Sequence, residues 1–144
     1  MQLVKNCVSW YHVSMKHIEV AAAVLIEDNA VFAAQRSNRG PLAKRWEFPG
    51  GKLEIGEDGR SAIVREIEEE LNTRIEVVRF LTTVEHQYPT FFLTMHAYLC
   101  RRLDGQLELS EHIASAWLGK TDLYGLDWAE ADIPIVRAVE KLLT

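Results

Sequence analysis

The segment from residue 50 to residue 73, GGKLEIGEDGRSAIVREIEEELNT, constrains the possible folds more than any other part of the chain. Within residues 58–71, the apolar residues that share one arc of a helical wheel are Ile63, Val64, Ile67 and Leu71. Glu66, Glu69 and Glu70 lie on the neighbouring arc, at the spacing that brings side chains together on one helix face. The pattern predicts an amphipathic helix that places carboxylates at the edge of a buried core, where a cleft can form.

The three carboxylates favour a divalent cation. Like charges at this spacing repel one another, and a bound cation removes that penalty. Carboxylate oxygens suit Mg²⁺, or Mn²⁺ in its place, and do not suit zinc. Gly50 and Gly51 allow backbone to approach a ligand closely, and Glu57 lies at the helix entry, where a carboxylate can satisfy free N–H groups. From these residues alone, a solvated acidic helix face stays open as the alternative.

The segments around the helix have the alternation and turn residues of strands. Strands are expected at 18–27, 30–36, 74–85, 90–102 and 116–118, with a short one in WEFP (46–49) that enters a Gly-rich loop. Asp28-Asn29 and Asp104-Gly105 are expected hairpin turns, 37–45 a loop, and 132–143 a closing helix. Strands on both sides of one central helix predict a mixed α/β sandwich whose sheet contains antiparallel pairs.

Length and charge limit the classes of protein. A chain of 144 residues predicts one domain, here 15–144, with residues 1–14 as an N-terminal extension of uncertain role. The net charge of −5 argues against a protein that coats polymeric nucleic acid. No apolar run has the length of a membrane span, and Cys7 and Cys100 are too few for a disulfide framework. We therefore expect a cytoplasmic protein that binds neither membranes nor polymeric nucleic acid, as a monomer or homodimer.

The spacing of the central segment resembles the Nudix box, Gly-x5-Glu-x7-Arg-Glu-U-x-Glu-Glu-x-Gly-U, in which U is a bulky apolar residue. The matching positions are Gly51, Glu57, Arg65, Glu66, Ile67, Glu69 and Glu70. Asn72 stands where the box has its last Gly, and Thr73 where it has its last apolar residue. Asn tolerates the left-handed conformation that Gly would adopt at a helix end, so the first departure is structurally acceptable.

The resemblance covers residues 17–143 and implies a Nudix α/β/α sandwich with a mixed sheet. It also implies Mg²⁺-dependent hydrolysis of a nucleoside triphosphate to the monophosphate and pyrophosphate, with water attacking the β-phosphorus. The implied metal ligands are the Gly50 carbonyl, Glu66, Glu69 and Glu70. Glu66 is the expected general base or water-orienting group, Arg65 positions it, and Glu69 completes the catalytic set.

Residues outside the box complete the expected site. Glu111, with Glu108 as second choice, is the expected further carboxylate, although an exposed loop position is an equal alternative. Arg36 resembles the phosphate-contacting arginine of MutT-type enzymes, whose guanidinium fork suits phosphate oxygens. Lys52 could add positive charge. The basic loop residues Arg39, Lys44 and Arg45 have either this role or one in solubility.

Three residues are expected around the base. By resemblance to MutT-type enzymes, Phe48 and Tyr88 match aromatic or apolar positions of the base pocket, with core packing as the alternative for Phe48. Asp132 stands where MutT-type enzymes place an amide that reads the purine edge, and a carboxylate there suits a cytosine amino group or, when protonated, an oxidised guanine. It is also a candidate N-cap before Ile133-Pro134.

These residues leave several functions open. The leading hypothesis is a MutT-like enzyme that removes oxidised nucleotides such as 8-oxo-dGTP. The same chemistry on CTP, dCTP or 5-modified cytosine nucleotides is the alternative that Asp132 supports. A non-catalytic nucleotide-binding Nudix module and a metal-stabilised structural helix are the remaining readings.

Overall fold

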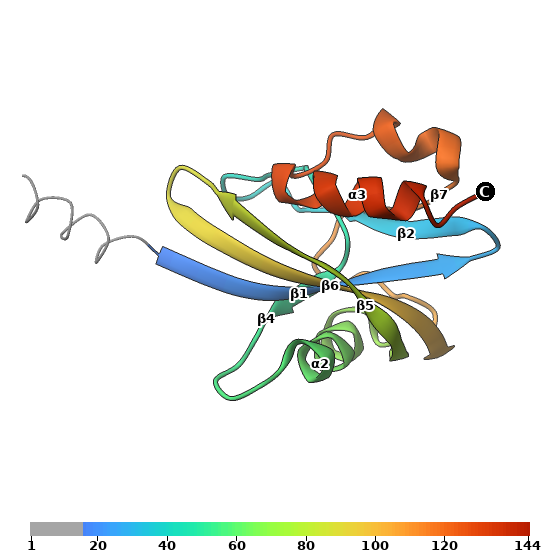
Figure 1. Cartoon of the computed structure of the whole chain (residues 1–144), viewed down its shortest axis with the longest axis horizontal. Coiled ribbons are helices and arrows are strands. Elements are labelled where there is room, and N and C mark those ends of the chain that lie inside the picture. The colour runs from blue at the N-terminus through green and yellow to red at the C-terminus, as the bar shows by residue number, and fades with distance from the viewer. Residues whose placement is uncertain (1–15) are drawn as a thin grey trace, which may run out of the picture.

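A mixed sheet of seven strands forms the middle layer of the computed structural model, which describes residues 16–144 (Figure 1). The strands are β1 (Lys16–Glu27), β2 (Ala30–Gln35), β3 (Trp46–Glu47), β4 (Gly50–Lys52), β5 (Arg74–Gln87), β6 (Phe91–Asp104) and β7 (Ala114–Leu118). The helices are α2 (Gly59–Leu71) and α3 (Ile133–Glu140), with 3-10 turns η1 (Lys120–Gly125) and η2 (Glu130–Asp132). The expected extension at 1–14 lies outside the described residues.

Strand β1 is the centre of the sheet. One edge of β1 pairs in parallel with β6, which in turn pairs antiparallel with β5. The other edge of β1 is shared, because β4 pairs with Val20–Ala22 and β2 pairs with Ile26–Glu27. β2 also pairs with β3 and β7. Since β2 and β4 take different parts of one edge, the sheet opens between them, and the candidate site forms there.

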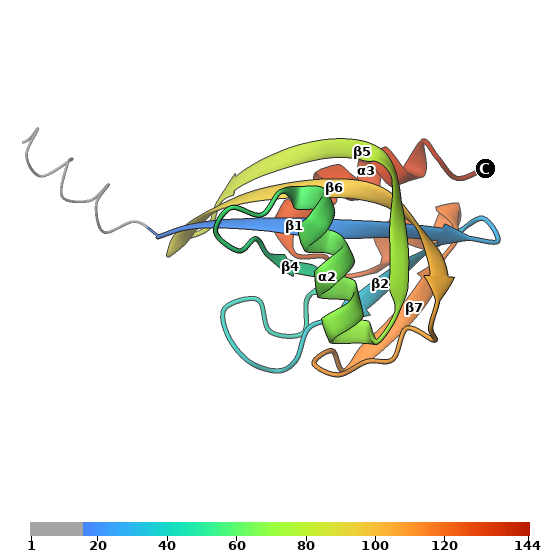
Figure 2. The same ribbon diagram turned by 90° about the horizontal axis from the view of Figure 1, so that it is seen from below.

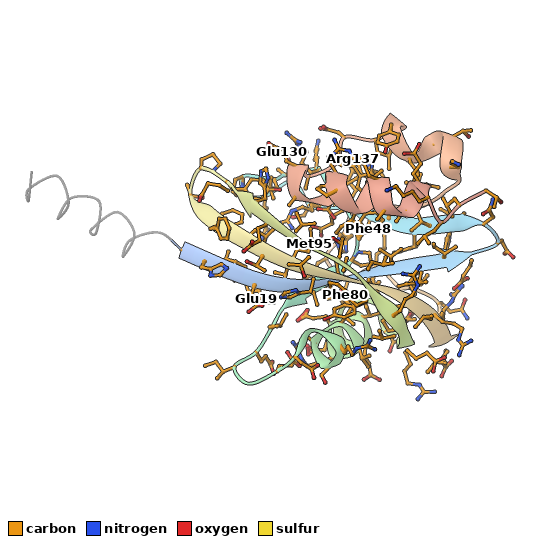
Figure 3. The ribbon with its side chains drawn as sticks, viewed as in Figure 1. Glu19, Phe48, Phe80, Met95, Glu130 and Arg137 are labelled. Atoms are coloured by element: carbon orange, nitrogen blue, oxygen red, sulfur yellow. The ribbon has the colours of Figure 1, made fainter. Side chains whose placement is uncertain are left out.

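The two helices cover opposite faces of the sheet, which confirms the expected α/β/α layers (Figure 1). Alternate residues of β1 enter two separate buried clusters: Ala21, Ala23 and Leu25 pack with α2, whereas Ala22 and Val24 pack with α3. Figure 3 shows Phe48 and Met95 between the sheet and α3, and Phe80 on the α2 side. In Figure 2, α2 lies across β1, and β5 and β6 bend around it. Within residues 16–144, no helix combines the length and apolarity that crossing a membrane would need.

Helix α2 forms where the sequence predicts it, and its ends have clear causes. The Asp58 carboxylate caps the first turn by accepting the Ser61 N–H at 2.8 Å. Asn72 ends the helix in the left-handed conformation, with φ of 50°, and its N–H donates to the Glu68 carbonyl. The role expected for Glu57 at the helix entry was wrong, because Asp58 is the cap and Glu57 pairs with Arg65.

The other expected elements need three corrections. The Gly-rich segment after Phe48 includes a short strand, β4, and is not wholly a loop. Asp104-Gly105 does not form a hairpin, because β7 pairs with β2 and not with β6. The closing helix is shorter than 132–143, since α3 ends at Glu140.

Candidate active site

A cavity of about 440 Å³ opens where the sheet separates between β4 and β2. The expected site residues that line it are Arg36, Phe48, Gly50, Lys52, Glu66, Glu70, Tyr88, Glu111 and Asp132. Arg65 and Glu69 are not in its lining and lie beside it on α2. Glu66 and Glu70 of α2 and Glu111 of the loop before β7 line one part of the cavity, the acidic end. Phe48 and Tyr88, which pack under α3, line the other part, the aromatic end.

The acidic end brings carboxylates together without neutralising them fully. Burial, followed by the charge of Glu66, raises the pKa of the Glu70 carboxyl from 4.5 to about 7. The charges of Glu111 and Glu47 also raise this pKa, whereas His112 lowers it. A divalent cation such as Mg²⁺ would offset the repulsion among these carboxylates, and their hard oxygen atoms are the ligands that it prefers.

The glycines of β4 are required by close approaches. A Cβ atom on Gly50 would lie 1.9 Å from the Ala21 carbonyl oxygen, and one on Gly51 would lie 2.0 Å from the Glu66 Oε2. The Glu66 carboxylate therefore occupies the space over Gly51 that any other residue would fill. This cradle brings backbone next to the acidic end, where Gly50 is part of the cavity wall.

Arg65 donates hydrogen bonds to three carboxylates of the Nudix-box segment. Its Nε and Nη2 each donate to the Glu57 carboxylate at 2.8 Å, and Nη1 donates to Glu66 at 2.9 Å and Glu69 at 2.7 Å. Nη2 also donates to the Lys52 carbonyl at 3.1 Å. These hydrogen bonds hold the pKa of Glu57 at about 2 and raise the pKa of Arg65 further above its ordinary value. Glu69 is thus turned toward Arg65, with its side chain 54% exposed.

Two polar residues of the cavity wall, Glu47 and His112, were not predicted from the sequence. Glu47 Oε1 accepts from Arg36 Nη1 at 3.0 Å, and Glu47 Oε2 lies 2.9 Å from His112 Nε2. The His112 side chain is 6% exposed, and two nitrogens of this group, His112 Nδ1 and Arg36 Nε, are buried without a hydrogen-bond partner. A polar residue between the apolar Trp46 and Phe48 was the available signal for Glu47.

The aromatic end is closed by hydrogen bonds as well as packing. Phe48 is buried and stacks on Trp128 with ring centroids 4.9 Å apart, so it both lines the cavity and packs in the core. The Tyr88 hydroxyl accepts the buried Ala131 N–H at 2.9 Å. Asp132 Oδ1 accepts the Phe48 N–H at 3.0 Å.

Asp132 does not have the capping role expected for it. It stands at the N-cap position of α3 but makes no side-chain hydrogen bond to the helix. Its carboxyl is buried, and this burial, with the charge of Glu47, raises its pKa well above 3.8. When it is protonated, this carboxyl offers an O–H donor beside an acceptor to the cavity that it lines.

The basic loop and the second-choice carboxylate lie elsewhere. Arg39, Lys44 and Arg45 are absent from the cavity lining, and Arg45 donates to the Trp128 carbonyl at 3.0 Å. Glu108 is also outside the lining and accepts from Asn72 Nδ2. Within residues 16–144, no group of three or more His, Cys, Asp or Glu side chains is already arranged to hold a metal ion. The donor chemistry of Glu66, Glu70 and Glu111 nevertheless fits a hard divalent cation.

Comparisons with known proteins agree with this architecture. A family model described as NUDIX domain matches residues 15–139. The chain is 35% identical over 128 residues to the CTP pyrophosphohydrolase of Escherichia coli (strain K12), covering 89% of this chain and 95% of that protein. It is 28% identical over 129 residues to the 8-oxo-dGTP diphosphatase of the same organism, covering 89% and 100%.

A solved structure with the same fold is the solution NMR structure of the DNA mismatch repair protein MutT, a Nudix hydrolase, from methicillin-resistant Staphylococcus aureus 252. Its TM-score is 0.74 at 37% identity, covering 89% of this chain and 98% of that chain. The α/β/α sandwich with a mixed sheet is therefore the Nudix fold. The chain belongs to the Nudix family, as a MutT-type hydrolase that acts on phosphoric anhydrides.

Proposed function

We propose that the protein is a Mg²⁺-dependent pyrophosphohydrolase that converts a nucleoside triphosphate and water into a nucleoside monophosphate and pyrophosphate. The observation that carries the proposal is the single cavity in which Glu66, Glu70 and Glu111 stand at one end and Phe48 and Tyr88 at the other. The acidic end suits a metal-bound polyphosphate. The aromatic end suits a base, since aromatic faces stack on any base.

Each residue at the acidic end has a distinct proposed task. Glu66, Glu70 and the Gly50 carbonyl hold Mg²⁺, with Glu111 as the further ligand. Bound there, Mg²⁺ would neutralise charge on the phosphate oxygens and would make the β-phosphorus more electrophilic toward water. Glu66 also orients the attacking water or accepts its proton, and Arg65 positions Glu66 by donating to it at 2.9 Å.

Glu69 requires a role that agrees with its contact to Arg65. Its Oε1 accepts from Arg65 Nη1, which also donates to Glu66. We infer that Glu69 is a further ligand of the metal and, through Arg65 Nη1, also helps to hold Glu66. Loss of the Glu69 charge is therefore expected to reduce turnover.

Positive charge near the phosphates comes from two residues. Arg36 lines the cavity and is held by Glu47, so its guanidinium is oriented before the substrate arrives. Lys52 is exposed at the rim of the same cavity. We propose that Arg36 binds the phosphates and that Lys52 adds to the field there.

We propose that the preferred substrate is an oxidised purine nucleotide such as 8-oxo-dGTP. The edge of 8-oxoguanine offers an N7–H donor beside the O6 acceptor, whereas guanine offers two acceptors there. A neutral Asp132 carboxyl, favoured by its raised pKa, matches the donor–acceptor pair and mismatches the two acceptors. Discrimination by a buried polar pair is large because the wrong base leaves it unpaired.

Cytosine nucleotides are the second candidate class. The N3 acceptor and the N4 amino donor of cytosine also complement a neutral carboxyl, so Asp132 supports this reading too. The 35% identity to a CTP pyrophosphohydrolase favours it specifically. A non-catalytic nucleotide-binding module would bind the same ligands without releasing pyrophosphate.

One assay separates these readings. Purified protein with Mg²⁺ is tested for pyrophosphate and phosphate release from 8-oxo-dGTP, dGTP, CTP and 5-methyl-dCTP. We expect pyrophosphate release, fastest from 8-oxo-dGTP, and release of phosphate instead would contradict attack at the β-phosphorus. Glu66→Gln and Glu69→Gln are each expected to lose at least ~10²-fold in rate.

Two further variants sharpen the assay. Glu68→Gln makes the same chemical change on α2, at an exposed position outside the cavity lining, and should turn over like the wild type. Asp132→Asn keeps an acceptor for the Phe48 N–H and is expected to change the ranking of the four substrates. An unchanged ranking would refute a role for Asp132 in reading the base.

A further inference from the structure

The two positions at which this chain departs from the Nudix box, Asn72 and Thr73, contact the loop that follows β6. Thr73 is 1% exposed. Its Oγ1 donates to the Leu71 carbonyl at 2.9 Å and accepts the buried Leu107 N–H at 2.8 Å. The bulky apolar residue that the box specifies here could not accept that N–H, which would then be buried without a partner.

The part of the same loop that precedes Glu111 makes several more hydrogen bonds to the end of α2. Asn72 Nδ2 donates to Glu108 Oε2 at 2.6 Å, and the Glu108 N–H donates to the Leu71 carbonyl at 2.9 Å. Ser110 Oγ donates to the Glu70 carbonyl at 2.7 Å. These contacts end one residue before Glu111.

Gly105 shows how closely the loop passes the helix end. A Cβ atom on Gly105 would lie 2.6 Å from the Thr73 Cα, and Gly105 has φ of +108°, which favours glycine. Leu107 is buried in the cluster that packs under α2. Figure 2 shows this loop passing the C-terminal end of α2 on its way to β7.

Residues 111 and 112 are the part of the loop that enters the cavity. Glu111 lines it with Glu70, and its charge acts on Glu70. His112 follows and contacts Glu47. After them the Ile113 N–H donates to the Gln35 carbonyl, and β7 begins. The loop is therefore anchored to α2 on one side of Glu111 and to β2 on the other.

We propose that Thr73, supported by Asn72, is a positioning residue that ties loop 105–113 to α2 and thereby holds Glu111 at the metal site. The inference rests on the proposed function, because that function gives Glu111 its role as a metal ligand. Thr73 touches neither substrate nor metal and acts only through the loop. A partner that orients a metal ligand typically changes metal affinity when it is removed.

The test is a double-mutant cycle read by direct metal binding. Mn²⁺ is titrated into the metal-free full chain, without nucleotide, and its dissociation constant is measured for wild type, Thr73→Val, Glu111→Gln and the double variant. Thr73→Val keeps the side-chain shape and removes the hydroxyl. We expect it to weaken Mn²⁺ binding about 10-fold in the wild-type background and to have no further effect beside Glu111→Gln.

Two controls separate positioning from stability. Thr73→Ser retains the hydroxyl and should restore Mn²⁺ affinity to that of the wild type. Thr94→Val removes another buried threonine hydroxyl, which contacts His17 outside the cavity, and should lower stability without changing Mn²⁺ affinity. If Thr73→Val fails to fold, Ser110→Ala removes an exposed tether of the same loop, and its cycle with Glu111→Gln should show the same non-additivity.

Additive effects in the Thr73–Glu111 cycle, or in the Ser110–Glu111 cycle if Thr73→Val does not fold, would overturn the inference. Mn²⁺ binding that does not depend on Glu111 would also overturn it. Pyrophosphate release is measured separately on the same wild-type protein. A non-additive cycle in a protein that hydrolyses none of the triphosphates would refute the proposed function and leave the positioning role intact. Hydrolysis of a triphosphate together with an additive cycle would support the proposed function and refute the positioning role.

Discussion

Replacing Glu70 by Gln should stabilise the metal-free protein while removing its activity. Glu70 is half-buried, and its pKa of about 7 means that the folded protein resists charging this carboxyl. Gln has nearly the same shape and carries no charge at any pH. The variant therefore removes the cost of ionising this position in the folded state, together with a proposed metal ligand.

The size of the effect follows from the two pKa values. The difference between 4.5 in the unfolded chain and about 7 in the folded protein corresponds to about 3 kcal/mol above pH 8. Partial screening by solvent reduces our expectation to about 2 kcal/mol. A raised carboxyl pKa means that the folded state holds more protons, so wild-type stability is full below pH 4.5 and is lost as pH rises toward 7.

Urea unfolding in EDTA at pH 4.5 and pH 8 measures this directly. We expect the two proteins to have equal free energies of unfolding at pH 4.5, and the variant to be more stable by about 2 kcal/mol at pH 8. A melting temperature about 4–8 °C higher is expected at pH 8. Glu68→Gln, at an exposed position of the same helix, should show no such difference. A Glu70→Gln variant that is no more stable than wild type at pH 8, or equally stabilised at both pH values, would refute the reasoning.

Three further outcomes are expected. Tyr88→Phe leaves the buried Ala131 N–H without its acceptor and should lower the free energy of unfolding by about 1–3 kcal/mol in urea titrations, so an unchanged midpoint would contradict that contact. Arg65→Lys keeps the charge but loses the two-pronged contact with Glu57, and kcat should fall about 10²-fold with KM little changed, whereas Arg60→Lys, outside the cavity, should match the wild type. Chelation with EDTA should abolish pyrophosphate release and added Mg²⁺ should restore it, so activity that survives exhaustive chelation would remove the metal from the mechanism.

Elements whose signals are local were predictable from the sequence. α2 has both a periodic apolar arc and end signals within one segment, and β1 and β2 flank a turn of two residues. The parallel pairing of β1 with β6 and the pairing of β7 with β2 join residues far apart in the chain, so no local pattern specifies them. Composition and alternation indicate a strand without naming its neighbour.

The Asp104-Gly105 turn shows how a correct local signal led to a wrong element. Gly105 does adopt a positive φ, as that dipeptide indicates. However, the chain uses this conformation to pass against Thr73, and the next strand pairs elsewhere. A turn residue predicts a backbone conformation and leaves open which segments the turn brings together.

The site was predictable where motif spacing applied and was missed where partners came from other elements. Glu66 and Glu70 line the cavity as expected because their helix is amphipathic. Glu47 and His112 meet across 65 positions of sequence, so neither identifies the other. Asp132 has the neighbours of an N-cap, yet its carboxyl bonds to Phe48, because β3 ends beside it in the folded chain.

The separation of the core into two clusters, one under each helix, has a consequence for how new specificities can arise. Phe48 and Tyr88 belong to the cluster under α3, whereas Ile63 and Ile67, which anchor the acidic helix, belong to the other, and the two clusters share no buried residue. Apolar substitutions that reshape the aromatic end can therefore be absorbed without repacking α2, since residues that share no packing partners behave independently. A library of substitutions confined to the apolar residues under α3 should thus change which base is preferred and leave the carboxylates of α2 in place.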